Sequence, residues 1–254
     1  MLTIGVAPPS SPRLSMAPVL QPPCMLASTR ASFLSPFVGL GFQIPKFTSI
    51  ISPKIQRLSI KASRTESTGV SLGFRAPDFQ LPEPLTGKTW TLQDFEAYPA
   101  LLVMFICNHC PFVIHLKKDI VKLSKFYMKK GLAVVAISSN SVVTHPQDGP
   151  EFMAEEAKFY SYPFPYLYDK SQDVAHDFGA VCTPEFFLFK KEGRRPFELV
   201  YHGQFDDSRP SNNVPITGRD LSMAIDSVLS GQPVSVHQKP SVGCSIKWHP
   251  KVKQ

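Results

Sequence analysis

The first 65 residues of this 254-residue chain contain no acidic side chain; the first one in the sequence is Glu66. The same segment holds ten serines, nine prolines and seven basic residues, and it follows neither a helical nor an alternating period. It also lacks a charged start followed by a long apolar core, which argues against a secretory signal peptide. Serine-rich, basic and acid-free segments are typical of organelle transit peptides, and the weight of proline and serine favours a plastid over a mitochondrion.

We therefore expect residues 1–62 to be a disordered chloroplast transit peptide that ends at Ile60-Lys61-Ala62, and the protein to reside in the stroma. The alternative is a disordered arm that is not removed. We then expect a linker over 63–71, a folded domain over 72–231 and a C-terminal tail over 232–254.

The rest of the chain lacks net charge. The whole chain carries a formal charge of +7, but residues 66–254 contain 20 basic and 20 acidic residues. A balanced domain lacks the basic surface that nucleic-acid binding requires. No run in the sequence approaches the ~18 apolar residues of a membrane-spanning helix. We therefore expect neither a nucleic acid nor a membrane as a partner.

Cysteine is scarce, with five residues in the chain. Cys24 would be lost with the transit peptide, which leaves Cys107, Cys110, Cys182 and Cys244. Four cysteines in a domain of this size are too few for a secreted scaffold that depends on disulfides. A close pair of cysteines in such a chain is more often catalytic or metal-binding.

The close pair, Cys107 and Cys110, lies where a buried strand meets a helix. The uncharged run over 100–106 predicts the strand, and apolar residues at helical spacing predict a helix over 109–130. Unpaired backbone N–H groups and the helix dipole favour thiolate over thiol at such a position. We expect Cys107 to be the exposed nucleophile and Cys110 to resolve the mixed disulfide.

His109, between the two cysteines, has two interpretations. As a cation it would stabilise a neighbouring thiolate and raise the reduction potential of the pair. As a solvent-exposed loop residue it would have only a modest effect. The pair itself has an alternative role as zinc ligands, which would require Cys244 together with His109, His115 or His249.

A second motif, Val181-Cys182-Thr183-Pro184, precedes a predicted strand over 185–190. A proline at the start of a strand is a place where a cis bond can expose backbone groups to a partner peptide. Cys182 has either a direct redox role or the usual role of a lone cysteine, which is a small buried side chain.

Cys244 lies on a C-terminal extension, where Ile246 and Trp248 offer side chains that can anchor it to the domain. It is either a resolving cysteine or a packed thiol. The charged cluster that begins at Asp206 follows a strand, and such clusters are mostly solvated turns, so we assign it no chemistry.

The order of the expected elements indicates an α/β domain. A strand, a helix and a second uncharged strand form a βαβ unit, and a hairpin and a helix follow it. The expected strands cover 100–106, 132–138, 185–190 and 198–205, and the expected helices cover 109–130, 151–160, 171–179 and 217–229. We expect a central mixed sheet flanked by helices.

Together, these motifs resemble the thioredoxin superfamily. In that superfamily a C-x-x-C motif and a cis-proline face each other across the site, and their counterparts here are Cys107 to Cys110 and Thr183-Pro184. More closely, the chain resembles the peroxiredoxin-like (AhpC/TSA-related) thioredoxin-fold proteins of plants and bacteria. The segments that carry this resemblance are Ala76-Pro77-Asp78-Phe79, Thr91-Leu92-Gln93-Asp94-Phe95, Tyr162-Pro163-Phe164-Pro165-Tyr166, Asp206-Asp207-Ser208-Arg209-Pro210 and Gly243-Cys244-Ser245-Ile246-Lys247-Trp248.

The resemblance covers about residues 72–249. It implies a thioredoxin-like fold with an N-terminal peroxiredoxin-type extension and a C-terminal tail, and a substrate groove shaped by Thr183 and Pro184. The chain also departs from the family patterns. Peroxiredoxins place a threonine three residues before the peroxidatic cysteine, a position held here by Cys107 if Cys110 is the equivalent, and no arginine matches their peroxide-orienting one. The buried aspartate of ordinary thioredoxins corresponds to Leu101.

The sequence thus predicts a thiol–disulfide oxidoreductase that acts through the Cys107–Cys110 dithiol in cell redox homeostasis, without an organic cofactor or a metal. The expected partners are protein thiols and disulfides, small thiols or peroxide, with plastid thioredoxin or glutathione as the electron donor. Two alternatives stay open. One is a peroxiredoxin-like thiol peroxidase with an antioxidant role, and the other is a non-catalytic binding protein of thioredoxin fold, with or without zinc.

Overall fold

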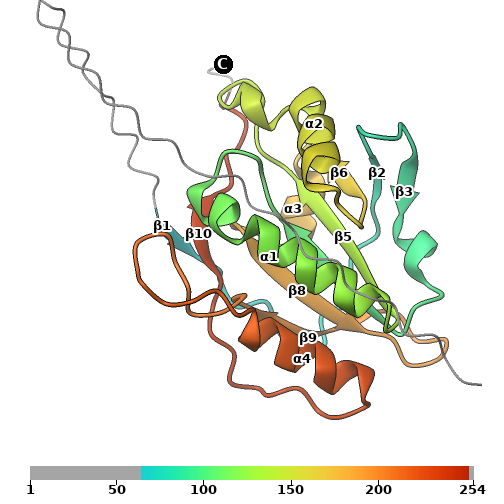
Figure 1. Ribbon diagram of the computed structural model, residues 1–254. Helices are drawn as coiled ribbons and strands as arrows, with labels where there is room; N and C mark the ends of the chain where they lie inside the picture. The colour runs from blue at the N-terminus through green and yellow to red at the C-terminus, as the bar shows by residue number, and fades with distance from the viewer. Residues whose placement is uncertain (1–63, 252–254) are drawn as a thin grey trace, which may run out of the picture. The chain divides into compact units, whose positions relative to one another are not determined.

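A five-stranded mixed sheet in the order β6-β5-β4-β8-β9 forms the centre of the protein (Figure 1). The structure is a computed structural model that describes residues 64–251, so the predicted transit peptide lies outside the described residues. The strands are β4 (Ala100–Phe105), β5 (Leu132–Ser138), β6 (Tyr166–Tyr168), β8 (Glu185–Lys190) and β9 (Glu198–Gly203). β4, β5 and β6 are parallel, and β8 and β9 run antiparallel to their neighbours.

Both faces of this sheet are covered, which explains why β4 and β5 lack charge and are buried along their whole length. Successive side chains of β4 enter two different cores. Leu102 and Met104 belong to one apolar cluster, and Leu101 and Val103 belong to the other.

Three helices pack on one face, namely α1 (Pro111–Met128), α2 (Pro150–Tyr160) and α4 (Arg219–Leu229). The other face carries α3 (Asp173–Phe178), the hairpin of β2 (Gln80–Pro82) and β3 (Thr89–Thr91), and the short 3-10 helix η1 (Leu92–Phe95). The hairpin and η1 form the expected N-terminal extension. The arrangement is the thioredoxin-like fold that the sequence predicts. None of the helices between residues 64 and 251 combines the length and the apolar character needed to cross a lipid bilayer.

A second sheet joins the two ends of the described chain next to the carboxyl end of β4. It has the order β1-β10-β7, with β1 at Arg64–Glu66, β10 at Val242–Ser245 and β7 at Cys182–Thr183. β1 lies within the predicted linker and β10 within the predicted tail. The predicted boundaries at 62, 71 and 231 remain predictions, but strand pairing continues on both sides of the predicted domain.

Candidate active site

Cys107 and Cys110 lie in the turn between β4 and α1, as expected. Cys110 is the N-cap residue of α1, and Pro111 occupies the first helical position, where a missing N–H does little harm. Both cysteines are fully buried and both are free thiols. The expectation that Cys107 is exposed is therefore wrong, because segments that are distant in the sequence pack over the turn.

Thr183 is the first of these covering residues, and it contacts both sulfurs. The Cys107 Sγ lies 3.4 Å from the Thr183 hydroxyl, and the Cys110 thiol, when protonated, donates to the Thr183 carbonyl at 3.1 Å. The Thr183–Pro184 peptide bond is cis, as the resemblance implies. The predicted substrate-groove residues thus lie against the dithiol.

Cys244 is the second covering residue. Antiparallel pairing of β10 with β7 places Cys244 opposite Thr183, and its Sγ lies 2.8 Å from the Cys110 Sγ. Cys182 is not part of this cluster of sulfurs, since its Sγ faces the Pro184 carbonyl at 4.0 Å. Burial, followed by the carboxylate of Glu185, raises the pKa of Cys182, which fits the packed-thiol interpretation.

The three clustered thiols differ in their pKa values. Burial alone would raise the pKa of Cys110, but hydrogen bonds from the Cys107 and Cys244 thiols and from the backbone N–H of Val113 outweigh it and lower that pKa far below the usual thiol range. Burial, the adjacent Cys110 and the charge of Asp148 raise the pKa of Cys107. The hydrogen bond to Cys110, and then burial, raise the pKa of Cys244. The lowered pKa therefore belongs to Cys110 and the raised ones to Cys107 and Cys244. The expected roles of Cys107 as nucleophile and Cys110 as resolving cysteine remain predictions.

Asp148 is a site residue that sequence reasoning missed. It ends the 3-10 helix η2 (Pro146–Asp148) and is fully buried. Its Oδ1 accepts the backbone N–H groups of Asn108 (2.9 Å) and His109 (3.2 Å), and its Oδ2 accepts the amide of Asn140 at 2.9 Å. Burial would raise the pKa of Asp148, but its hydrogen-bond donors, His109 first, outweigh this and lower it. Asp148 lies 40 residues from Asn108 on a 3-10 helix of only three residues, so no local pattern marks it.

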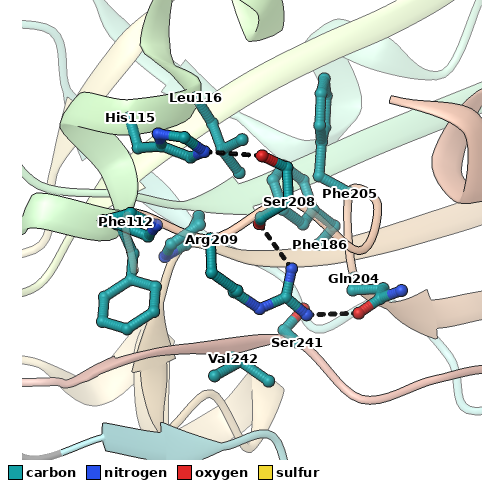
Figure 2. A pocket seen from close by; sticks show the side chains of 12 residues that line it. Phe112, His115, Leu116, Phe186, Gln204, Phe205, Ser208, Arg209, Ser241 and Val242 are labelled. Atoms are coloured by element: carbon teal, nitrogen blue, oxygen red, sulfur yellow. Dashed lines mark hydrogen bonds between the residues drawn. The ribbon is translucent and has the colours of Figure 1, made fainter. Parts of the chain in front are cut away.

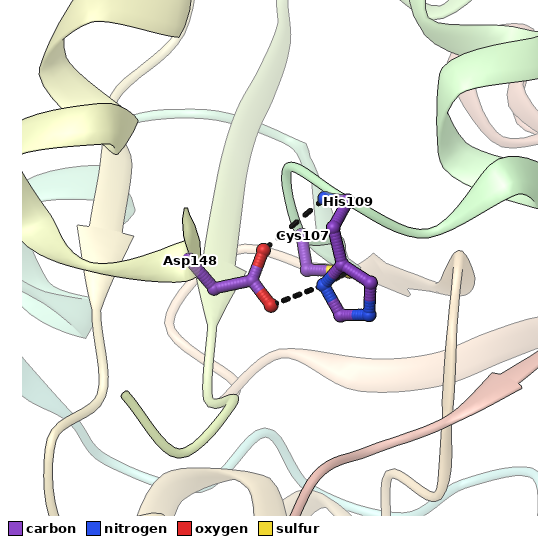
Figure 3. Close-up of side chains that lie close together, drawn as sticks. All are labelled: Cys107, His109 and Asp148. Carbon is purple, nitrogen blue, oxygen red and sulfur yellow. Dashed lines mark hydrogen bonds and ion pairs between the residues drawn. The ribbon is translucent and has the colours of Figure 1, made fainter. Parts of the chain in front are cut away.

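His109 is fixed by Asp148, because its Nδ1 lies 2.5 Å from the Asp148 Oδ2 (Figure 3). The same nitrogen lies 3.9 Å from the Cys107 Sγ. A cysteine–histidine–aspartate relay requires the two ring nitrogens to serve two different partners, so this arrangement is not such a relay. The ring retains 20% of its exposure and stacks on His145 at 4.6 Å. His109 is therefore held by Asp148 and is not a freely exposed loop residue, and its stabilisation of a neighbouring thiolate remains a prediction.

Possible metal ligands also gather here. One ligand atom each of Cys107, His109 and Asp148 lies within 4.8 Å of the others, and this is the one such group among residues 64–251. The zinc set that the sequence leaves open as an alternative is not assembled in that range. Cys110 and Cys244 are outside the group, and His115 and His249 hydrogen-bond to serines instead.

Part of the charged cluster that starts at Asp206 lines a small hollow. Its Ser208 and Arg209 point into this hollow (Figure 2), and Pro184 also lines it. The Asp206 carboxylate accepts backbone N–H groups of its own loop, including that of Gly218 at 2.7 Å. The Arg209 guanidinium donates to the carbonyls of Asp206 and Ser208 and to the side chain of Gln204. The cluster therefore shapes a loop, and Asp206 and Ser208 are buried in it and not solvated as expected.

Known proteins share this fold and part of this sequence. Residues 72–194 match the model of the AhpC/TSA family. A hypothetical protein of Sinorhizobium meliloti 1021 is 49% identical, with a TM-score of 0.70, over 73% of this chain and 98% of that one. An uncharacterized conserved protein of Geobacillus kaustophilus is 46% identical, with a TM-score of 0.71, over 74% and 98%. The thiol-disulfide oxidoreductase ResA of Geobacillus thermodenitrificans is 27% identical over 132 residues, which are 51% of this chain and 70% of that protein.

Proposed function

Residues 72–194 form an AhpC/TSA-family domain in a thioredoxin-like fold, and from this premise we propose that the protein is a thiol–disulfide oxidoreductase acting through Cys107 and Cys110. The observation that carries the proposal is that two free thiols share one helix N-terminus and that Thr183 contacts both of them. The related ResA protein bears the same activity in its name.

In this proposal the Cys110 thiolate attacks a sulfur of the partner's disulfide and forms a mixed disulfide. The Cys107 sulfur then attacks Cys110, the partner leaves as a dithiol, and the Cys107–Cys110 disulfide remains. Two electrons pass from the dithiol to the partner, and the reverse sequence oxidises a partner dithiol. Because both sulfurs are buried, a partner reaches them only when a covering segment moves.

The test is disulfide mapping of the recombinant protein over graded glutathione redox poise, with alkylation of free thiols and mass spectrometry. We expect a reversible Cys107–Cys110 disulfide that survives the Cys182→Ser control. If these two cysteines never pair at any poise, the proposed function is wrong. The measured potential of the couple then decides whether the protein donates or accepts electrons.

The lowered pKa of Cys110 favours a second candidate, a thiol peroxidase. A peroxidase would consume peroxide much faster than a free thiol and would form a sulfenic acid on Cys110 that a thiol-trapping reagent captures. Cys110→Ser would abolish both signals, and Cys182→Ser would leave them unchanged. A rate no higher than that of a free thiol eliminates this candidate.

We further propose that the protein works in the chloroplast stroma, with plastid thioredoxin or glutathione as its electron donor. The acid-free, serine-rich composition of residues 1–62 supports this location. Fusion of that segment to a fluorescent protein tests it, and accumulation of the fusion outside plastids contradicts it.

A further inference from the structure

The Cys110 sulfur has two thiol neighbours, and one of them lies far away in the sequence. Cys107 is its partner within the motif, and Cys244 arrives from the C-terminal strand with an Sγ–Sγ distance of 2.8 Å. All three side chains are at least 98% buried. A bonded pair of sulfurs is separated by about 2.05 Å, so Cys110 and Cys244 need to approach by less than about 1 Å to bond.

Strand β10 holds Cys244 in this position from both sides. Cys244 pairs with Arg64 of β1 and with Thr183 of β7. A Cβ atom on Gly243 would lie 2.0 Å from the Thr183 carbonyl oxygen, so only glycine allows β10 to come this close.

Hydrogen bonds also hold the residues that directly precede and follow β10. Before it, the Ser241 hydroxyl donates to the Gly203 carbonyl at 2.7 Å. After it, the Ile246 N–H donates to the Val181 carbonyl at 2.9 Å. Cys244 thus contacts Cys110 from a buried strand that is held by pairing on both sides.

We propose that Cys244 is a third redox residue and that Cys110 exchanges its disulfide partner between Cys107 and Cys244. In the oxidised dithiol, the Cys244 sulfur attacks the Cys110 sulfur. The Cys107–Cys110 bond breaks, the Cys110–Cys244 bond forms, and the proton of Cys244 passes to the Cys107 sulfur. One disulfide replaces another, so no oxidant or reductant is consumed.

This exchange deepens the proposed function and rests on it. It gives a mixed disulfide on Cys110 two internal resolving thiols, Cys107 and Cys244. The two oxidising equivalents are then stored either in the Cys107–Cys110 disulfide, within the motif, or in the Cys110–Cys244 disulfide, which links α1 to β10. Cys182 takes no part, because its sulfur contacts the Pro184 carbonyl, at 4.0 Å, and not the sulfur of Cys110.

The experiment uses the full chain as wild type and as the Cys107→Ser, Cys244→Ser and Cys182→Ser variants. Each is equilibrated at graded glutathione poise, quenched with acid, alkylated and mapped by mass spectrometry, and circular dichroism checks the fold. In the wild type and in Cys182→Ser we expect two populations of oxidised molecules, one with the Cys107–Cys110 disulfide and one with the Cys110–Cys244 disulfide. Cys107→Ser should form the Cys110–Cys244 disulfide in more than half of the molecules, and Cys244→Ser should form only Cys107–Cys110.

The proposal is overturned if neither the wild type nor Cys107→Ser forms a Cys110–Cys244 disulfide at the poise that fully oxidises Cys107–Cys110 in Cys244→Ser. The wild-type measurement decides this even if Cys107→Ser does not fold. Absence of the Cys107–Cys110 disulfide in both the wild type and Cys244→Ser is a different outcome and refutes the proposed function instead.

Discussion

At the scale of single residues, Cys110 differs from the other cysteines in the hydrogen bonds that its sulfur receives. We predict one thiol of the wild type to titrate at low pH in the ultraviolet thiolate absorbance, and this signal to vanish in Cys110→Ser. Cys107→Ala removes one donor, which costs the thiolate about 1.5–3 kcal/mol and raises the pKa of Cys110. Cys182→Ser serves as the control and should titrate like the wild type. An unchanged low-pH signal in Cys110→Ser would show that another thiol carries the charge.

Asp148 leads to a second prediction at this scale. Asp148→Ala leaves buried N–H groups without an acceptor, so we expect a loss of about 2–4 kcal/mol in the free energy of unfolding at neutral pH. Folding lowers the pKa of Asp148, so the ionised carboxylate stabilises the protein above its unfolded pKa of about 4 and this stabilisation is lost as the pH falls through the folded pKa.

Urea unfolding at several pH values tests this prediction with Asp148→Asn, which cannot titrate. The stability advantage of the wild type over Asp148→Asn should shrink steadily as the pH falls below about 4. Asp177→Asn is the matched control, because Asp177 is exposed on α3 and its substitution should change stability by less than about 0.5 kcal/mol. A constant difference across the pH range would contradict the assignment of Asp148.

At the scale of elements, β10 depends on one glycine for its register against β7. Gly243→Ala would place a methyl group in steric clash with the Thr183 carbonyl, so β10 has to move away from β7. We predict a loss of about 1–3 kcal/mol in stability and at least a tenfold drop in the yield of the Cys110–Cys244 disulfide. Gly69→Ala is the control, since nothing lies within 4 Å of its Cβ position. Equal yields from the two variants would mean that β10 does not position Cys244.

The elements also differ in how far the sequence predicts them. β5 and β8 agree with the expected ranges, and β4 and the helices agree to within a few residues, because long apolar runs and helical periodicity report burial locally. β1, β7 and β10 were not predicted. They have two to four residues each and exist only because they pair with one another.

At the scale of the whole molecule, the predicted tail contributes to both apolar cores. Cys244 belongs to one cluster and Ile246 to the other. Truncation after Gly231 should therefore cost at least about 3 kcal/mol and lower Tm by roughly 6–12 °C, as measured by thermal unfolding. Truncation after His249 removes only the end of the chain and should leave Tm unchanged within about 2 °C. Equal Tm values for the two truncations would show that β10 is dispensable.

The sequence by itself determined where the proposed chemistry lies. An uncharged strand that runs into a helix places Cys107 and Cys110 at a helix N-terminus, and the order of strands and helices gives an α/β domain. The resemblance of its motifs to the thioredoxin superfamily implies the thioredoxin-like fold. The positions of strands and helices depend on residues that are near one another in the sequence, so hydrophobic patterns along the chain reveal them.

Only the tertiary structure decided which thiol has the lowered pKa, what buries it and which thiol lies beside it. The answers come from Asp148, Thr183 and Cys244, which reach the motif from three separate segments. A pKa depends on donors, charges and burial within a few ångströms, and those distances are set by how β7, β10 and η2 pack and not by their spacing in the sequence.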